Sequence, residues 1–222
     1  MLDALPPYNA VIFDMDGVLT DSEPAFHAAV NDILARYGAH TPVDEYQRFI
    51  GMATPAMWAK MIVLKGLAAP LEEILQAYEA PLMARLREPR PPLPGARELI
   101  DELRARGVPI ALCTASYSRW AEVILGAAGL GGVFGVLSTA DMVEATKPDP
   151  APYRLAASKL GFAPERCIAV EDSTNGLTSA LRSGACVIQL RATATAAPPM
   201  PGVERVISSL HDFPLELVAA AP

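Results

Sequence analysis

Two aspartates stand one residue apart directly after a short apolar run. Residues 11–13 are Val-Ile-Phe, and Asp14, Asp16 and Gly17 follow them. Two like charges this close repel each other, so the pair indicates either an acidic turn or helix cap, or a site that holds a cation or moves protons. A calcium loop of the EF-hand type is excluded, because with Asp14 as its first position the final acidic ligand would be Ala25.

Other polar side chains follow other short apolar runs of the chain. They are Thr114 and Ser116 after residues 110–113, and Glu171 and Asp172 after residues 167–170; Lys147 stands apart, in the segment TKPDP before another expected helix. Taken singly, each has a structural explanation as a helix cap or a solvated surface residue. In open α/β sheets, however, ligands bind beyond the carboxyl ends of the strands, so these residues together predict one site. The sequence contains neither a P-loop nor a GxGxxG spacing.

The pattern of elements predicts the fold class that would position these residues. Short apolar strands alternate with helical segments in the second half of the chain, which indicates a parallel sheet covered on both faces. We expect strands at residues 10–13, 109–113, 167–170, 186–190 and 205–207, with an apolar run at 133–137, and helices at 96–106, 118–128, 151–160 and 174–182.

The segment between the first strand and a proline-rich stretch at residues 87–95 is predicted to be all-helical. Helices are expected from a cap at Ser22 to Gly38, and at residues 43–50, 55–64 and 71–86. The first carries one apolar stripe of Phe26, Val30, Ile33, Leu34 and Tyr37. The chain is therefore predicted to be an α/β protein: a Rossmann-like parallel sheet core formed by residues 1–20 and 91–222, with an inserted α-helical cap domain at residues 21–90, called the helical insert below.

Composition and charge exclude several classes of function. The chain has 222 residues, of which 51% are hydrophobic and 19% charged, as in a globular protein with one large or two smaller domains. Its net charge is −7 and it has no basic run, so nucleic-acid binding is not expected, and a phosphate site would need its own local cations. The sequence does not specify an oligomeric state, and a monomer is compatible with it.

Cysteine usage and hydropathy give expectations about location. Cys113, Cys167 and Cys186 are widely spaced beside apolar runs, which is typical of buried thiols in a reducing cytoplasm. The first residues have neither a cationic start nor an apolar core of a signal peptide, and no apolar segment approaches about 18 residues. We therefore expect a cytoplasmic protein without membrane association.

Taken together, four of these segments resemble the motifs of a known family. The segment FDMDGVL, the threonine after IALC, the segment KPDP and the segment VEDSTNG match, in order and spacing, the four motifs of the haloacid dehalogenase superfamily of phosphatases and phosphomutases. The resemblance covers essentially the whole chain and extends to the subfamily with a helical cap after the first motif. Within it, the chain is most similar to the β-phosphoglucomutase-like and phosphoglycolate-phosphatase-like members.

The resemblance implies a role for each polar residue at the strand ends. Asp14 would be the nucleophile that forms an aspartyl-phosphate, and Asp16 the general acid and base. Lys147 would supply fixed positive charge to Asp14 and the phosphate. Phosphate oxygens would be held by the Thr114 side chain and the amides of Ala115 and Ser116.

The same resemblance implies Mg²⁺ as the cofactor. An anion attacking a phosphate needs a cation between them, and Mg²⁺ prefers oxygen ligands. The family pattern supplies the Asp14 carboxylate, the backbone carbonyl of Asp16 and the Asp172 carboxylate as ligands. Glu171 would act through water.

The helical insert is expected to select the substrate. The loop from Gly51 to Thr54 resembles the cap loop that reaches the active site in this family. In β-phosphoglucomutases this loop carries an arginine and the helix after the first motif carries a histidine; the matching positions here hold Thr54 and Phe26, and His27 is one residue away. Substrate contacts are expected from Glu23, Met52 and Thr54, and Trp58 is either a further contact or part of the core of the insert.

These departures favour a hydrolase over a mutase. The sequence predicts a Mg²⁺-dependent phosphatase that acts on a small phosphorylated metabolite, a sugar phosphate or similar monoester, through an aspartyl-phosphate. One alternative is a β-phosphoglucomutase-like phosphomutase. The other is a protein that binds phosphorylated metabolites without catalysis, against which the presence of Asp14, Asp16, Lys147 and Asp172 argues.

Overall fold

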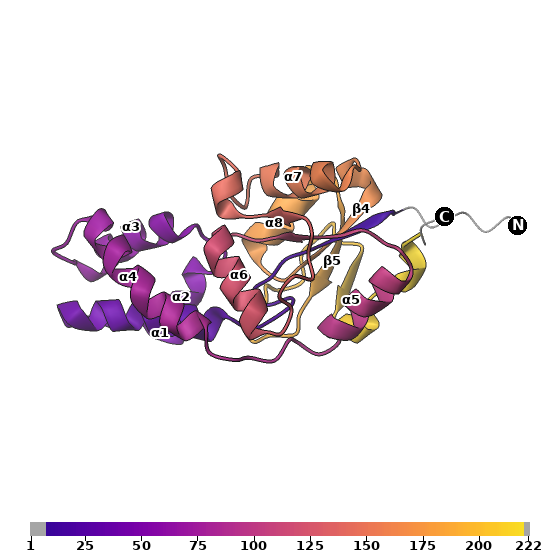
Figure 1. Ribbon diagram of the computed structural model, residues 1–222. Helices are drawn as coiled ribbons and strands as arrows, with labels where there is room; N and C mark the ends of the chain where they lie inside the picture. Colours follow the sequence, from indigo (N-terminus) through magenta and orange to yellow (C-terminus); the bar gives the residue numbers. More distant parts are fainter. Residues whose placement is uncertain (1–7, 220–222) are drawn as a thin grey trace, which may run out of the picture.

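The computed structural model of the chain describes residues 8–219 and has a six-stranded, fully parallel sheet at its centre (Figure 1). The strand order is β3-β2-β1-β4-β5-β6, which places β1 between β2 and β4. The bounds are β1 Ala10–Phe13, β2 Ile110–Cys113, β3 Leu137–Ser138, β4 Cys167–Glu171, β5 Cys186–Leu190 and β6 Arg205–Ile207. The predicted α/β class with a parallel, Rossmann-like sheet is confirmed.

Alternate residues of the strands face two separate hydrophobic clusters. Val11 and Phe13 of β1 face one cluster, which includes residues of α5 (Ala96–Ala105) and α6 (Ser118–Ala127). Ala10 and Ile12 face the other, which includes residues of α7 (Ala151–Leu160) and α8 (Thr174–Ser183). Helices therefore cover both faces, as expected for short strands without polar alternation.

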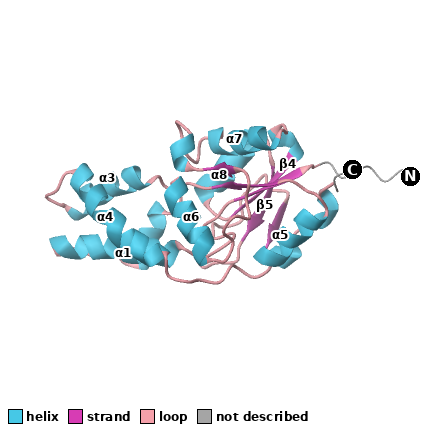
Figure 2. Cartoon of the chain, viewed as in Figure 1, coloured by secondary structure: helices cyan, strands magenta, loops and turns pink. Residues whose placement is uncertain are grey.

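Residues 22–87 form only helices and turns, as predicted (Figure 2). The helices are α1 Glu23–Leu34, α2 Val43–Tyr46, α3 Thr54–Lys65 and α4 Leu71–Leu86. They extend beyond one end of the sheet in Figure 1, and α1 packs along α4. The division of the chain into a core of residues 1–20 and 91–222 and a cap of residues 21–90 stays a prediction.

Three details differ from the expected elements. The apolar run at residues 133–137 contributes only Leu137 to a strand, the two-residue β3, and Phe134 packs instead against Phe13, with ring centroids 6.2 Å apart. Tyr37 leaves the apolar stripe and is 36% exposed, because α1 ends at Leu34 and a 3₁₀ turn follows. The predicted helix at residues 43–50 divides into α2 and a second 3₁₀ turn. The 3₁₀ segments are Ala35–Tyr37, Gln47–Phe49, Ala140–Met142, Pro164–Arg166, Leu210–Asp212 and Leu215–Leu217.

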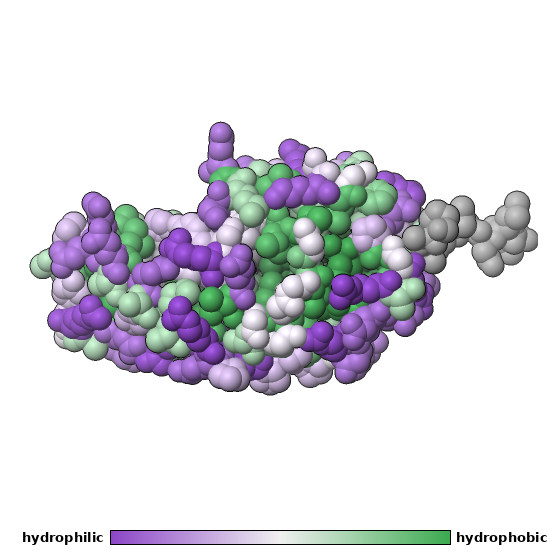
Figure 3. All heavy atoms as spheres, viewed as in Figure 1, coloured by the Kyte–Doolittle hydropathy of each residue, from purple (hydrophilic) through white to green (hydrophobic). Residues whose placement is uncertain are grey.

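Among the described residues 8–219, no helix combines the length and apolar composition that crossing a membrane requires. On the face shown in Figure 3, hydrophobic residues gather over the part of the molecule that holds the sheet, with hydrophilic residues distributed around them.

Candidate active site

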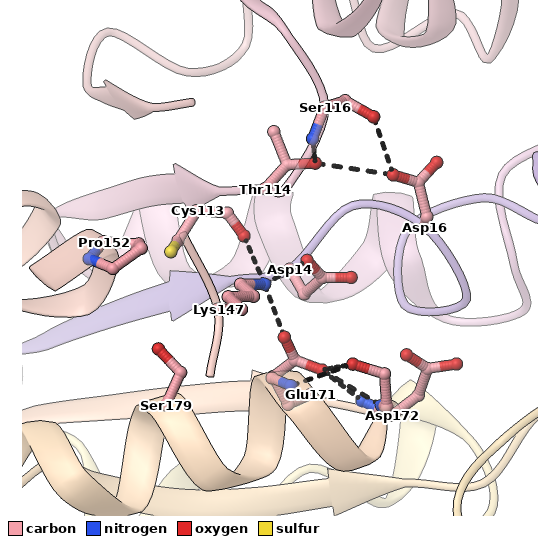
Figure 4. Close-up of polar contacts among 12 residues, drawn as sticks. Asp14, Asp16, Cys113, Thr114, Ser116, Lys147, Pro152, Glu171, Asp172 and Ser179 are labelled. Atoms are coloured by element: carbon pink, nitrogen blue, oxygen red, sulfur yellow. Dashed lines mark hydrogen bonds and ion pairs between the residues drawn. The ribbon is translucent and has the colours of Figure 1, made fainter. Parts of the chain in front are cut away.

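The polar residues singled out in the sequence meet at the carboxyl ends of the three central strands (Figure 4). Phe13 of β1 pairs in register with Leu112 of β2 and Val170 of β4, so the residues that follow reach the same level of the sheet. Asp14 follows β1, Thr114 follows β2, and Glu171 ends β4. Parallel pairing thus brings together residues that are about a hundred positions apart in the chain.

Lys147 connects two of the acids. Its Nζ atom lies 2.5 Å from Asp14 Oδ1, 2.5 Å from Glu171 Oε1 and 3.0 Å from the carbonyl oxygen of Cys113. These three contacts use all three N–H groups of an ammonium ion. The side chain is 2% exposed; burial alone would lower its pKa, but the charges of Asp14 and Glu171 raise the pKa of Lys147 well above the usual value.

Glu171 is fixed by hydrogen bonds on both carboxylate oxygens. Oε1 accepts from Lys147 and from the Tyr153 hydroxyl at 3.0 Å, and Oε2 accepts from the Asp172 amide at 2.9 Å and from the Ser173 amide and hydroxyl at 3.1 Å. A carboxylate with two oxygens has room for about four such contacts. The structure therefore shows Glu171 as the residue that orients Lys147, and it leaves Glu171 little capacity for a further ligand.

Gly176 provides the space that Glu171 occupies. It lies in the first turn of α8, and a Cβ atom added there would lie 1.7 Å from Glu171 Oε1. The sequence predicted neither this role nor that of Tyr153, although the glycine belongs to the fourth motif. A buried side chain next to a helical glycine leaves no local signal in a sequence.

Replacing Gly176 by alanine is expected to move the Glu171 carboxylate and, with it, Lys147. We expect the free energy of unfolding to fall by about 1–3 kcal/mol, the usual cost of overpacking, and turnover to fall with it. Gly126→Ala is the matched control, because Gly126 also lies in a helix and has no atom within 4 Å of an added Cβ. Denaturant unfolding of both variants checks this; equal stability of the two would contradict the assigned packing role.

Three buried carboxylates lie close together at this site. Ligand atoms of Asp14, Glu171 and Asp172 all lie within 4.8 Å of one another. Burial is the main cause that raises the pKa values of Asp14 and Asp172 well above their usual values. The negative charge of Glu171 is the second cause for both groups. Lys147 alone does not balance these charges, and oxygen ligands of this kind fit Mg²⁺.

Gly17 shapes the same cluster from the side of the first motif. Its φ is +83°, in the left-handed region that favours glycine, and an added Cβ would lie 2.0 Å from Asp172 Oδ2. The chain can therefore turn away after Asp16 while Asp172 lies directly against its backbone. The backbone carbonyl of Asp16 as a metal ligand stays a prediction.

Asp16 has a different environment from Asp14. Its Oδ1 accepts a hydrogen bond from the Ser22 hydroxyl, and its Oδ2 accepts from Ser116 Oγ at 3.3 Å and Thr114 Oγ1 at 3.4 Å. Burial raises the pKa of Asp16, and these hydroxyl groups lower it in part. Figure 4 shows its carboxylate beside Ser116 and Thr114 and apart from the group around Lys147. Two nearby carboxyl groups in such different surroundings can take different roles.

One expectation for this region needs correction. Ser22 does not cap α1 with its side chain, because its hydroxyl is bound to Asp16 instead. The amide of Ser116 donates to Thr114 Oγ1 at 3.0 Å and closes a local turn, and its role as a phosphate donor stays a prediction. Ala115 and Ser116 line the cavity described next, whereas Thr114, Glu171 and Asp172 are not among the residues that line it.

A cavity of about 70 Å³ lies between these residues and the helical insert. Glu23, Met52 and Thr54, which are expected to contact the substrate, line it, and the contact itself stays a prediction. Tyr46, Tyr78 and Trp120 also line it. The sequence did not predict this, because aromatic residues at helical spacing are more often core. Trp58 is fully buried against Tyr78, with ring centroids 5.3 Å apart, and is therefore core of the insert. His27 is 2.8 Å from the Thr41 carbonyl and does not line the cavity.

The helical insert touches the α/β part on both sides of this cavity. A Cβ added to Gly51 would lie 3.4 Å from Ser173 Oγ, so the predicted cap loop packs against the fourth motif. Glu79 of α4 accepts hydrogen bonds from Arg119 at 2.6 Å and from the Trp120 indole at 3.1 Å, and Arg119 lowers the pKa of Glu79. These contacts hold Trp120 as one wall of the cavity.

The chain is similar to several known proteins. Residues 8–184 match the haloacid dehalogenase-like hydrolase family. A putative phosphatase of Bacillus subtilis (YhcW) is 34% identical over 184 residues, 81% of this chain and 82% of that protein. Hexitol phosphatase B of Escherichia coli is 33% identical over 172 residues, 76% of this chain and 77% of that protein. The crystal structure of CbbY from Rhodobacter sphaeroides in complex with phosphate has a TM-score of 0.83 and 27% identity, and covers 92% of this chain and 96% of its own.

Proposed function

The chain belongs to the haloacid dehalogenase-like hydrolase family, and from that premise we propose that it is a Mg²⁺-dependent phosphatase. It is a phosphoric monoester hydrolase, and its substrate is a small phosphate monoester such as a sugar phosphate. The observation that carries the proposal is the state of Asp14. One carboxylate oxygen is held by Lys147, and within the described residues the other, Oδ2, accepts no hydrogen bond and is available to attack phosphorus.

The reaction divides into two transfers. In the first, Asp14 Oδ2 forms a bond to phosphorus, the ester bond breaks, and Asp16 gives its proton to the leaving oxygen. In the second, Asp16 takes a proton from a water molecule that attacks the same phosphorus, and Asp14 leaves as a carboxylate with inorganic phosphate as product. The raised pKa of Asp16 supports its service as the acid in the first transfer.

Charge balance in this reaction depends on Lys147 and on the acidic cluster. Lys147 fixes Asp14 and keeps a positive charge beside the transferred group. Asp14 and Asp172, with the backbone carbonyl of Asp16, would hold Mg²⁺, and Glu171 would orient Lys147 and the loop at Asp172. When bound, Mg²⁺ supplies charge neutralisation for the phosphate.

The identity of the relatives supports a sugar or polyol phosphate as the substrate. The protein named hexitol phosphatase B is 33% identical to this chain. A phosphomutase is less well supported, because Thr54 stands where the cap loop of β-phosphoglucomutases carries an arginine for a second phosphate.

Phosphate release from a panel of phosphorylated small carbohydrates tests this function. We expect release from at least one member with Mg²⁺ and its loss with excess EDTA, restored by added Mg²⁺. Conversion of β-glucose 1-phosphate to glucose 6-phosphate in the presence of a bisphosphate primer would favour the mutase instead. No release from any member under any of these conditions would contradict the phosphatase.

A further inference from the structure

The side of the cavity that faces the helical insert carries one acidic side chain, that of Glu23. This region, the leaving-group pocket, is lined by Glu23, Phe26, Tyr46, Met52 and Thr54. Phe26 packs edge-on against Trp120, with ring centroids 6.1 Å apart, and Met52 adds a further apolar wall. The pocket is therefore largely apolar and aromatic, with a single carboxyl group.

The carboxyl group of Glu23 has an oxygen without a partner. Oε2 is shielded from solvent and has no hydrogen bond with any described residue, and Tyr46 lines the same pocket. Burial, followed by the charge of Asp16, raises the pKa of Glu23 to about 8. Glu23 lines the cavity, and a buried polar atom without a partner is costly, so a ligand atom that supplies the missing hydrogen bond to Oε2 would be favoured there.

The cavity offers no cation to a second negative charge. Among the described residues that line it, Lys147 is the one cation, and its three N–H groups already reach Asp14, Glu171 and the Cys113 carbonyl. A carboxylate or second phosphate on the leaving group would lie near Glu23 and Asp16 without a counter-charge. A hydroxyl group both donates and accepts, so it suits Glu23 in either protonation state.

We propose that Glu23 is a specificity-determining residue that pairs with a hydroxyl group of the substrate, so that the enzyme selects uncharged polyol or sugar leaving groups and rejects anionic ones. This inference rests on the proposed phosphatase function and narrows its substrate class. It follows that phosphorylated hydroxy acids and bisphosphates are poor substrates, while polyhydroxylated monophosphates are good ones.

Three matched esters test the inference: glycerol 3-phosphate, 3-phosphoglycerate and propyl phosphate. The second replaces the terminal CH₂OH of the first by a carboxylate, and the third lacks the hydroxyl groups. For the unmodified enzyme we expect kcat/KM for glycerol 3-phosphate to exceed that for propyl phosphate by about tenfold or more, and that for 3-phosphoglycerate by about 10²-fold or more.

Two substitutions assign these ratios to Glu23. Glu23→Ala is expected to bring the ratio of glycerol 3-phosphate to propyl phosphate close to one, whereas Glu23→Gln, which keeps a donor and an acceptor, is expected to preserve it within about threefold. An unchanged ratio in Glu23→Ala, or equal turnover of glycerol 3-phosphate and 3-phosphoglycerate by the unmodified enzyme, would overturn the inference and leave the phosphatase standing. If the enzyme released phosphate neither from these esters nor from any member of the carbohydrate panel, the proposed function would be removed, and the inference with it.

Discussion

Replacing Asp14 by asparagine is expected to abolish turnover while leaving the protein folded. The amide keeps the size of the carboxylate but is a far weaker nucleophile toward phosphorus. Loss of a nucleophile typically lowers kcat by on the order of 10⁴–10⁶-fold. Asp14 is only 6% exposed among buried acids, so removing its charge relieves repulsion from Glu171, although it weakens the contact with Lys147. The measurement is steady-state phosphate release, together with thermal unfolding.

The matched control for this substitution is Asp101→Asn. Asp101 is exposed on α5, away from the strand ends, so the same change of side chain there should leave turnover unaltered. An Asp14→Asn enzyme that keeps more than a tenth of the unmodified turnover would contradict the role of Asp14. Among the described residues, Glu171 is the other carboxylate beside Lys147, and its oxygens are already occupied by hydrogen bonds, so it is not expected to replace Asp14 as the nucleophile.

Replacing Lys147 by methionine is expected to have the largest effect on stability. Methionine has a similar length, but the substitution leaves Asp14 and Glu171 buried without the ammonium group that lies 2.5 Å from each. Removing one partner of a buried ion pair typically costs about 3–5 kcal/mol of the free energy of unfolding. Turnover should fall as well, because the nucleophile loses its anchor and its compensating charge. Urea unfolding and phosphate release measure the two effects.

Two further variants separate charge from packing in this result. Lys60→Met, at an exposed position of α3, should change the free energy of unfolding by less than about 0.5 kcal/mol. Adding Asp14→Asn to Lys147→Met should recover part of the lost stability, because it removes one of the two unpaired charges. A loss below about 1 kcal/mol for Lys147→Met, or no recovery in the double variant, would contradict the proposed electrostatic balance.

The sequence predicted the elements around the site well because their signals are local. The helix at residues 151–160 and the strands at 186–190 and 205–207 agree residue for residue with α7, β5 and β6. The helix has apolar residues at helical spacing and is followed by Gly161, and the two strands are short, mainly apolar runs. The expected meeting of Asp14, Thr114 and Glu171 also followed from a simple rule, that parallel strands end at one edge of the sheet. Lys147 does not follow a strand, and its place was expected from the third motif of the family.

The features that the sequence did not predict depend on how separate elements pack against one another. Tyr46, Tyr78 and Trp120 belong to three different helices, and only their packing places them around one cavity. The same is true of Gly176, whose missing side chain matters only because Glu171 fills the space. Ser22 carries the usual signal of a helix cap, and a tertiary hydrogen bond to Asp16 overrides that local preference.

The proposed two-step reaction depends on a covalent phosphoryl group on Asp14. The most direct measurement is rapid acid quenching of the enzyme during turnover of its best substrate with Mg²⁺, followed by mass spectrometry of the peptide that contains Asp14 and Asp16. We predict a phosphoryl group on Asp14 that forms and disappears with the substrate and is absent from Asp14→Asn. Turnover with phosphate release but no phosphorylated Asp14, or with the phosphoryl group on another residue, would contradict the mechanism.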